Sequence, residues 1–155
     1  MATIICYDIH GNAVPVPAES LTFRPAVYGI FIENDQIVLQ KQPQTGLWHP
    51  PGTMLAASDT PTQVIRHHFR QLVGLTPVVS SLLFVEDQYF LDEERRAWKL
   101  SAMYYGLERP LTTATTLTES EEASQTQWVP LGELQREQFQ FGYEAVQAGK
   151  LQQKL

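Results

Sequence analysis

The side chains best suited to chemistry are concentrated in one short segment, residues 66–71, which holds two arginines, two histidines and a glutamine. Arg66 and Arg70 are four residues apart, so on a helix they share a face, with His67 beside them. Guanidinium groups bind phosphate and carboxylate through paired hydrogen bonds. The spacing therefore predicts a basic face that holds an anion without a metal. The alternative is a pair of ordinary solvent-exposed arginines.

The histidines form a weaker metal-binding pattern. Adjacent side chains on a helix point about 100° apart, so His67 and His68 do not converge on one ion. A metal site that combines His49, His68 and Asp59 is conceivable. The sequence favours instead two polar residues on the exposed part of a helix, and a turn role for Asp59 before that helix. We therefore expect no metal site.

Aromatic residues elsewhere in the chain are candidates for the walls of a pocket. Tyr28, Trp48, Tyr104 and Tyr105 suit a base or another flat ligand. For at least half of them, core packing is the alternative role. The predicted ligand-binding residues are Trp48 from this aromatic group and four residues of the polar segment, Arg66, His68, Arg70 and Gln71.

The helix that must carry the polar segment has recognisable ends. Thr60 is a candidate N-cap, Pro61 suits the first turn, and Gly74 is typical of a helix stop. The apolar residues of the segment fall on one helical face, which predicts that the helix packs on a sheet; they are Ile65, Phe69, Leu72 and Val73.

Strand patterns alternate with this helix, which predicts a mixed α/β fold. The most apolar run, residues 26–32, forms a predicted hairpin with 37–39. An N-terminal hairpin is expected from residues 3–8 and 13–16. Two long strands are expected at 78–90 and 97–107.

The C-terminal part is expected to be mostly helical. Residues 131–139 and 141–152 are predicted helices after a short strand at 127–129, and 111–126 is predicted to be a surface loop. Apolar anchors for the two helices are Leu134, Phe139, Val146 and Leu151.

Composition restricts the function class. With 155 residues the chain fits one domain, and 17 acidic against 11 basic residues give a net charge of −6. This balance argues against a nucleic-acid partner. No apolar run reaches the roughly 18 residues of a membrane span, so no membrane partner is expected. The single cysteine, Cys6, excludes an intrachain disulfide, reads as a buried apolar residue, and fits a reducing cytoplasm.

Four short motifs follow one another along the chain. They are Tyr28-Gly29-Ile30, Trp48-His49-Pro50-Pro51-Gly52, Phe69 with Gly74-Leu75, and Trp128-Val129-Pro130-Leu131 followed by Leu134. In these motifs and their order the chain resembles the Nudix family. The resemblance runs over residues 23–146, which makes residues 1–22 an N-terminal hairpin extension of a single domain 1–155. It implies an α/β/α sandwich around a mixed β-sheet.

The catalytic motif of that family, G-x5-E-x7-R-E-U-x-E-E-x-G-U with U apolar, can be anchored on Gly74 and Leu75. It then covers residues 53–75 without a gap, and its first glycine falls on Thr53. Of the five charged motif positions only one keeps an acid; in order they are Asp59, His67, His68, Gln71 and Leu72.

In the family, the helix glutamates bind Mg²⁺ or Mn²⁺, which clamps the diphosphate and activates water. Histidine nitrogen and amide oxygen are poor ligands for these ions, and leucine is none. The resemblance therefore implies a retained scaffold without the usual metal cluster. No cofactor is expected, and Mg²⁺ or Mn²⁺ only if hydrolysis is retained.

Two function hypotheses follow. In the first, the protein has lost metal-dependent hydrolysis and binds a small ligand, such as a nucleotide or another phosphorylated metabolite, or acts as a non-catalytic homodimer. In the second, it is a divergent hydrolase of a nucleoside diphosphate derivative. Some family members take a catalytic glutamate from a late loop, so a relocated base would come from Glu86, Asp87, Glu119, Glu121 or Glu122. The alternative for the last three is a solvated acidic loop.

Overall fold

The computed structural model describes residues 2–111 and 126–153. Its strands are β1 (Thr3–Tyr7), β2 (Ala13–Pro17), β3 (Thr22–Glu33), β4 (Gln36–Lys41), β5 (Trp48–His49), β6 (Gly52–Met54), β7 (Val78–Leu91), β8 (Ala97–Glu108) and β9 (Thr126–Pro130). Its α-helices are α1 (Pro61–Val73) and α3 (Tyr143–Gln153), and its 3₁₀ turns are η1 (Ala18–Ser20), η2 (Leu131–Glu133) and η3 (Arg136–Gln138).

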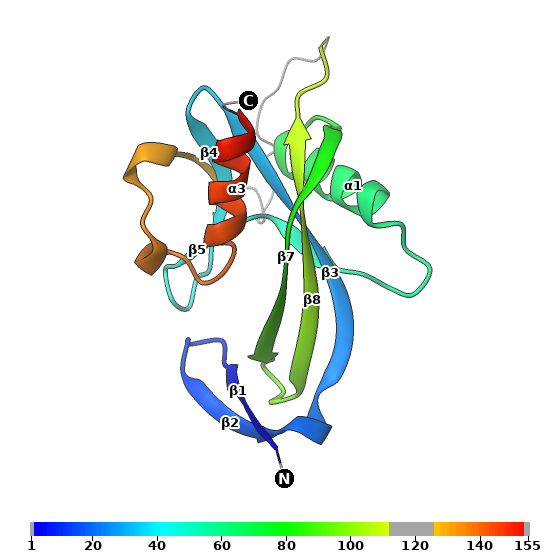
Figure 1. The fold of residues 1–155 in the computed structure, drawn as a ribbon, viewed down its shortest axis with the longest axis vertical. Helices are drawn as coiled ribbons and strands as arrows, with labels where there is room; N and C mark the ends of the chain where they lie inside the picture. The colour runs from blue at the N-terminus through cyan, green and yellow to red at the C-terminus, as the bar shows by residue number, and fades with distance from the viewer. Residues whose placement is uncertain (1, 112–125, 154–155) are drawn as a thin grey trace.

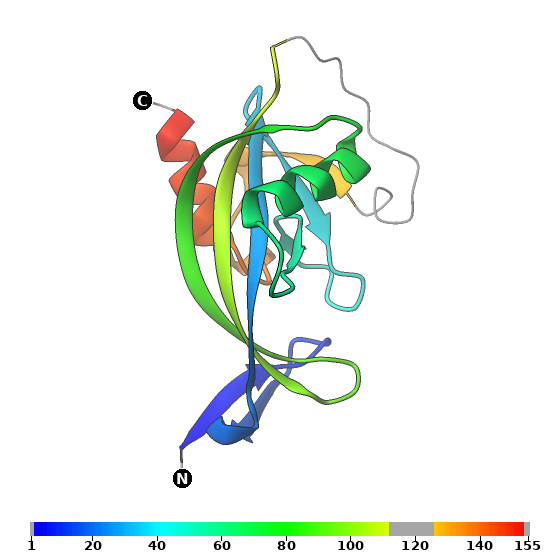
Figure 2. The same cartoon turned by 90° about the vertical axis from the view of Figure 1, so that its right-hand side faces the viewer.

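The strands of the described residues form one mixed sheet, in the order β2-β1-β7-β8-β3-β4-β5, with β6 beside β3 and β9 beside β4. The sheet is strongly curled, with α1 on one face and α3 on the other (Figures 1 and 2). This arrangement confirms the α/β/α sandwich that the sequence predicted. No helix within the described ranges is long and apolar enough to cross a membrane.

Strand β3 is the centre of the sheet and pairs in parallel with β8 over residues 22–31. The other edge of β3 pairs with two different strands. Residues 26–28 pair with β6, and residues 32–33 pair with β4. A tight turn joins β3 to β4, because Asn34 and Asp35 adopt φ values of 53° and 62°. Strand β5, between β4 and β6 in the chain, pairs with the far end of β4, and β6 then returns to pair with β3.

Two apolar clusters fill the two faces. Val27 and Phe31 of β3 pack with α1, whereas Tyr28 and Ile30 pack on the α3 side. Gly29 lets the helix approach, since a Cβ atom there would lie 2.4 Å from Leu107 and 2.5 Å from Phe69. The alternation of β3 side chains thus explains why this strand is buried on both faces.

The predicted ends of helix α1 are confirmed. Pro61 is its first residue, and Gly74 ends it with φ of 79° and an N–H that donates to the Arg70 carbonyl. The four apolar residues of the predicted face are all buried. Thr60 occupies the N-cap position, but its side chain makes no capping hydrogen bond. The Asp59 carboxylate instead accepts from the backbone N–H of Ala56 at 2.8 Å, which supports its turn role.

The C-terminal part differs from the expectation. Residues 131–139 form the short turns η2 and η3 rather than a helix, because Leu134, Gln135 and Phe139 are extended. Phe139 is buried and bridges to Trp48, so tertiary packing overrides local helical preference. Leu151 is 67% exposed, and its predicted role as an anchor was wrong, whereas Val146 is fully buried. Residues 112–125, most of the predicted loop, lie outside the described residues.

The N-terminal hairpin of β1 and β2 extends the sheet at the end where the N-terminus lies (Figure 1). Strand β1 meets β7 in parallel, with Tyr7 opposite Phe90. Cys6 is fully buried against Leu91 and Ala97, as expected from its apolar setting. This packing raises the pKa of the Cys6 thiol and fixes the hairpin beside the end of β7.

Candidate ligand-binding site

A cavity of about 640 Å³ opens between the N-terminal hairpin and β7. Its walls include residues 7–9 of the hairpin, 86–91 of β7 and 139–142 before α3, together with His49 and Gly52. We name it the hairpin cavity. Its volume lies within the roughly 300–1,000 Å³ that is usual for small-molecule sites.

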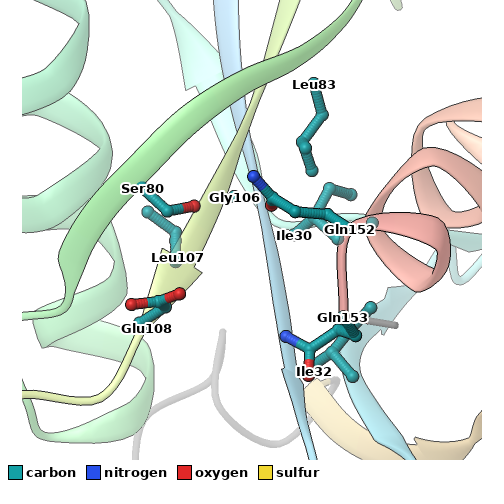
Figure 3. A pocket seen from close by; sticks show the side chains of 10 residues that line it. Ile30, Ile32, Ser80, Leu83, Gly106, Leu107, Glu108, Gln152 and Gln153 are labelled. Atoms are coloured by element: carbon teal, nitrogen blue, oxygen red, sulfur yellow. The ribbon is translucent and has the colours of Figure 1, made fainter. Parts of the chain in front are cut away.

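A second hollow lies higher on the same face, between β7, β8 and α3. Figure 3 shows Ser80, Leu83 and Gln152 at its border. Its volume is about 10 Å³, which is space for about one water molecule. It is too small for a ligand.

One wall of the hairpin cavity carries a chain of hydrogen bonds. Tyr104, which is fully buried on β8, donates its hydroxyl proton to Glu86 at 2.6 Å. The side-chain amide of Gln88 donates to the same hydroxyl at 2.8 Å. Because side chains alternate along a strand, Glu86 and Gln88 share the face of β7 that borders the cavity. Burial, then the hydrogen bond to Glu86, raises the pKa of Tyr104 far above its usual range.

Aromatic rings support this wall from behind and beside it. The ring of Tyr28 stacks on Tyr104, with centroids 5.2 Å apart, and meets Phe141 edge-on at 5.1 Å. Phe141 in turn stacks on His49 at 4.9 Å. Burial and the negative charge of Glu86 raise the pKa of Tyr28, so it also stays neutral. The wall is therefore rigid and uncharged except at Glu86.

The loop before α1 brings His49 and Gly52 to the cavity. A Cβ atom on Gly52 would lie 2.2 Å from the Val27 carbonyl oxygen, so only glycine allows β6 to pair this closely with β3. The ring Nδ1 of His49 donates to the Pro50 carbonyl at 2.9 Å. Burial lowers the pKa of His49, and nearby His68 lowers it further, against the effect of the Pro50 bond. We therefore expect a neutral imidazole here.

The polar segment of α1 is divided between two flanks of the helix. His68 is half-buried and close enough to His49, which lines the cavity, to affect its pKa. Arg66 and Arg70 are each two residues from His68, about 200° around the helix, and both are exposed. Arg66 donates to the Pro77 carbonyl at 3.0 Å on that other flank. The arginines and His68 are therefore not brought together.

The remaining motif positions of α1 have unequal surroundings. His67 and Gln71 are exposed, whereas Leu72 is fully buried in the cluster that joins α1 to β3. Within residues 2–111 and 126–153, no group of three or more His, Cys, Asp or Glu side chains is suited to hold a metal ion. This donor set does not fit Mg²⁺ or Mn²⁺, which prefer several carboxylate oxygens.

Of the acids predicted as relocated bases, Glu86 borders the cavity with its carboxylate in the hydrogen-bond chain. Asp87 contributes to the lining, but its carboxylate lies 3.9 Å from the Lys99 ammonium on the other face of the strand. Glu119, Glu121 and Glu122 fall outside the described residues.

The predicted aromatic walls are also divided. Tyr28 borders the cavity and Tyr104 lies behind it, whereas Tyr105 packs on the α1 side. Trp48 is half-buried, with the Lys41 ammonium 4.7 Å from its ring centroid. Its neighbour His49 lines the cavity instead.

Sequence reasoning missed Gln88, Phe141 and the hairpin wall. The period of two along β7 was a signal for Gln88, since it places that residue beside Glu86. The hairpin wall had no such signal, because it depends on how β1 packs against β7.

The curled mixed sheet lies between two helices, and the hairpin cavity lies beside the loop that precedes α1. A family model described as the NUDIX domain matches residues 22–148. The chain therefore belongs to the NUDIX family.

Solved structures agree with this assignment. A MutT protein from Methanosarcina mazei Go1 is similar with a TM-score of 0.60 and 14% identity, over 86% of this chain and 96% of that one. A MutT NUDIX hydrolase from Burkholderia pseudomallei gives 0.57 and 16%, over 83% and 97%. An ADP-ribose pyrophosphatase from Streptococcus suis gives 0.56 and 13%, over 84% and 89%. At these identities the likeness shows the fold alone. No curated protein matches the chain.

Proposed function

We propose that this chain binds a small nucleotide-like ligand in the hairpin cavity and does not carry out metal-dependent diphosphate hydrolysis. The observation that carries the proposal is the state of α1 beside the cavity. Where the family motif has glutamates, α1 has His68, Gln71 and the fully buried Leu72. The scaffold of the family is thus kept without its metal ligands.

The cavity supports the binding part of the proposal. Its volume of about 640 Å³ suits a nucleoside-sized molecule, and its aromatic walls suit a flat head group. The Streptococcus suis protein of the same fold is named for a nucleoside diphosphate derivative, ADP-ribose. A nucleotide-like ligand is therefore the first class to test, with its head group in the cavity and its phosphates outside the acid-lined deep part.

The proposal is tested by calorimetric titration with nucleoside diphosphates and their derivatives, once with Mg²⁺ and once with a chelator. Because no metal bridges ligand and protein in this proposal, the dissociation constant should be the same in both buffers within about twofold. Binding that requires the metal would overturn the proposal.

A divergent hydrolase is the second candidate, and the position of Glu86 favours it. Its side chain lines the cavity and accepts a hydrogen bond from Tyr104, which supports Glu86 as a candidate base. This candidate requires metal-dependent release of phosphate or nucleoside monophosphate that Glu86→Gln abolishes. The matched control is Glu108→Gln, which removes an exposed charge at the end of β8, outside the cavity lining.

A homodimer and a cytoplasmic location stay predictions. The exposed apolar residues Phe23, Leu82 and Val85 lie on the α1 side of the sheet and form a candidate dimer surface. Sedimentation of the protein in solution tests whether it self-associates. The buried free thiol of Cys6 is compatible with a reducing compartment.

A further inference from the structure

The charges around the hairpin cavity are one-sided. Among the described residues that line it are four acids, Asp8, Glu86, Asp87 and Glu144, and no lysine or arginine. The lining histidine, His49, has a lowered pKa because of burial. The deep part of this cavity is therefore unsuited to a phosphate or carboxylate group.

Three of the four acids are already stabilised by partners. Glu144 pairs with Arg136, and Asp87 faces Lys99 at 3.9 Å. Asp8 accepts hydrogen bonds from the backbone N–H groups of His10 and Asn12, each at 2.9 Å. Unlike Glu144 and Asp87, Glu86 has no ion pair within the described residues, and its hydrogen bonds come from the neutral side chains of Tyr104 and Gln88. Its charge is thus not compensated by a cation.

The hydrogen-bond chain fixes what Glu86 and Gln88 offer to a ligand. A carboxylate only accepts, so the Tyr104 hydroxyl must donate to it and must accept from Gln88. The Gln88 amide nitrogen therefore faces Tyr104, which leaves its carbonyl oxygen and the second Glu86 oxygen as hydrogen-bond acceptors. Two acceptors two residues apart on one strand face form a compact recognition edge.

The aromatic rings beside this edge suit a flat group. Tyr28, Phe141 and Phe90 line the cavity, and the stacking of Tyr28 on Tyr104 holds the wall in place. Aromatic faces attract cations and planar systems, and both effects strengthen where water is excluded.

We propose that the hairpin cavity selects a planar head group with adjacent N–H donors on one carbon, as in an amidinium, a guanidinium or the amino edge of a guanine-type base. The N–H pair is held by Glu86, with Gln88 beside it, and the ring or plane lies against the aromatic wall. This inference rests on the proposed function, because it names the part of the ligand that the same cavity binds.

The test uses three probes of one shape and different charge, benzamidine, benzamide and benzoate, titrated into the full-length protein and followed by amide chemical shifts. Benzamidine should bind at least about tenfold more tightly than benzamide, and benzoate should not bind, because the edge offers only acceptors and one negative charge. Guanosine and inosine then separate the two sources of the chemistry. Guanosine has the amino group that inosine lacks, so a site for a neutral base should bind guanosine more tightly than inosine. A site for a cation should bind benzamidine and neither nucleoside.

Two variants locate the contact. Glu86→Gln keeps the size and the bond to Tyr104 but removes the charge, and should weaken benzamidine binding at least about tenfold. Glu108→Gln removes an exposed charge at the end of β8, outside the cavity lining, and should change benzamidine binding less than about threefold. Circular dichroism confirms that each variant is folded, and the probe series on the unchanged protein does not depend on either.

Benzoate binding equal to or tighter than benzamidine binding would overturn the inference and leave the hairpin cavity as a ligand site. Unaltered benzamidine binding by Glu86→Gln would overturn the role of Glu86. If no probe shifts the cavity resonances while nucleotides bind, the head-group inference fails and the proposed function stands. If neither probes nor nucleotides bind, both fail.

Discussion

Tyr104 links the core of the protein to the wall of the hairpin cavity. It is fully buried, yet its hydroxyl has two hydrogen-bond partners on β7, Glu86 and Gln88. Tyr104→Phe leaves both partners without that hydroxyl and should lower the free energy of unfolding by about 1–3 kcal/mol. Urea denaturation measures this. Tyr105→Phe, on the other face of β8, is the control and should change stability by less than about 0.5 kcal/mol.

Because Tyr28 and Tyr104 are buried, we expect the folded protein to lose stability at alkaline pH. Burial, with the effect of Glu86, raises the pKa of both Tyr28 and Tyr104 in the folded protein. Below the usual tyrosine pKa of about 10 both states keep the proton, and above it only the unfolded chain releases it. Urea midpoints should therefore fall as the pH rises from about 9 to about 11. If all six tyrosines of the folded protein ionise near the ordinary value, the expectation is wrong.

Some residues of the candidate site could be predicted from their types, although their binding role stays a prediction. Glu86 and the two tyrosines were predicted from their types, and the structure places them together. The predicted basic set was divided, because residues two apart on a helix point to opposite sides. Gln88 was missed because the role of its side-chain amide depends on the hydrogen bond to Tyr104, which a single sequence does not reveal.

Because α1 lacks several of the carboxylates of the family motif, we expect that one substitution cannot restore metal-dependent hydrolysis. Leu72 is fully buried against β3, whereas Gln71 is exposed. Leu72→Glu places an uncompensated charge in the core and should cost at least about 3 kcal/mol of stability. Gln71→Glu should change stability by less than about 0.5 kcal/mol. Chemical denaturation of the two variants separates these cases. A stable Leu72→Glu variant that binds Mg²⁺ would show that this position opens to the site.

Elements were predictable where a period was long and clear. Residues 26–32 of β3 are an uninterrupted apolar run, and α1 has both ends marked by proline and glycine. The predicted helix at residues 131–139 failed, since the burial of Phe139 and its bridge to Trp48 require extended backbone there. Such long-range contacts leave no local pattern in a single sequence.

The whole molecule depends on the N-terminal hairpin for one wall of the cavity. Cys6 is the single cysteine and is fully buried between the hairpin and the sheet. Its reaction with a thiol reagent should be at least about a hundredfold slower than in the urea-unfolded chain, because the hairpin must open first. A ligand that contacts both hairpin and β7 should slow it further. A rate equal to that of the unfolded chain would mean that the hairpin is not packed in solution.

We propose that this NUDIX-family scaffold binds a ligand without the metal-dependent reaction. The decisive experiment measures release of phosphate and nucleoside monophosphate from a panel of nucleoside diphosphate derivatives, with Mg²⁺, with Mn²⁺ and with a chelator. We expect no turnover above the protein-free rate in any of the three, because α1 lacks the carboxylates that hold the metal in the family motif. Turnover that needs the metal and stops with the chelator would contradict this proposal.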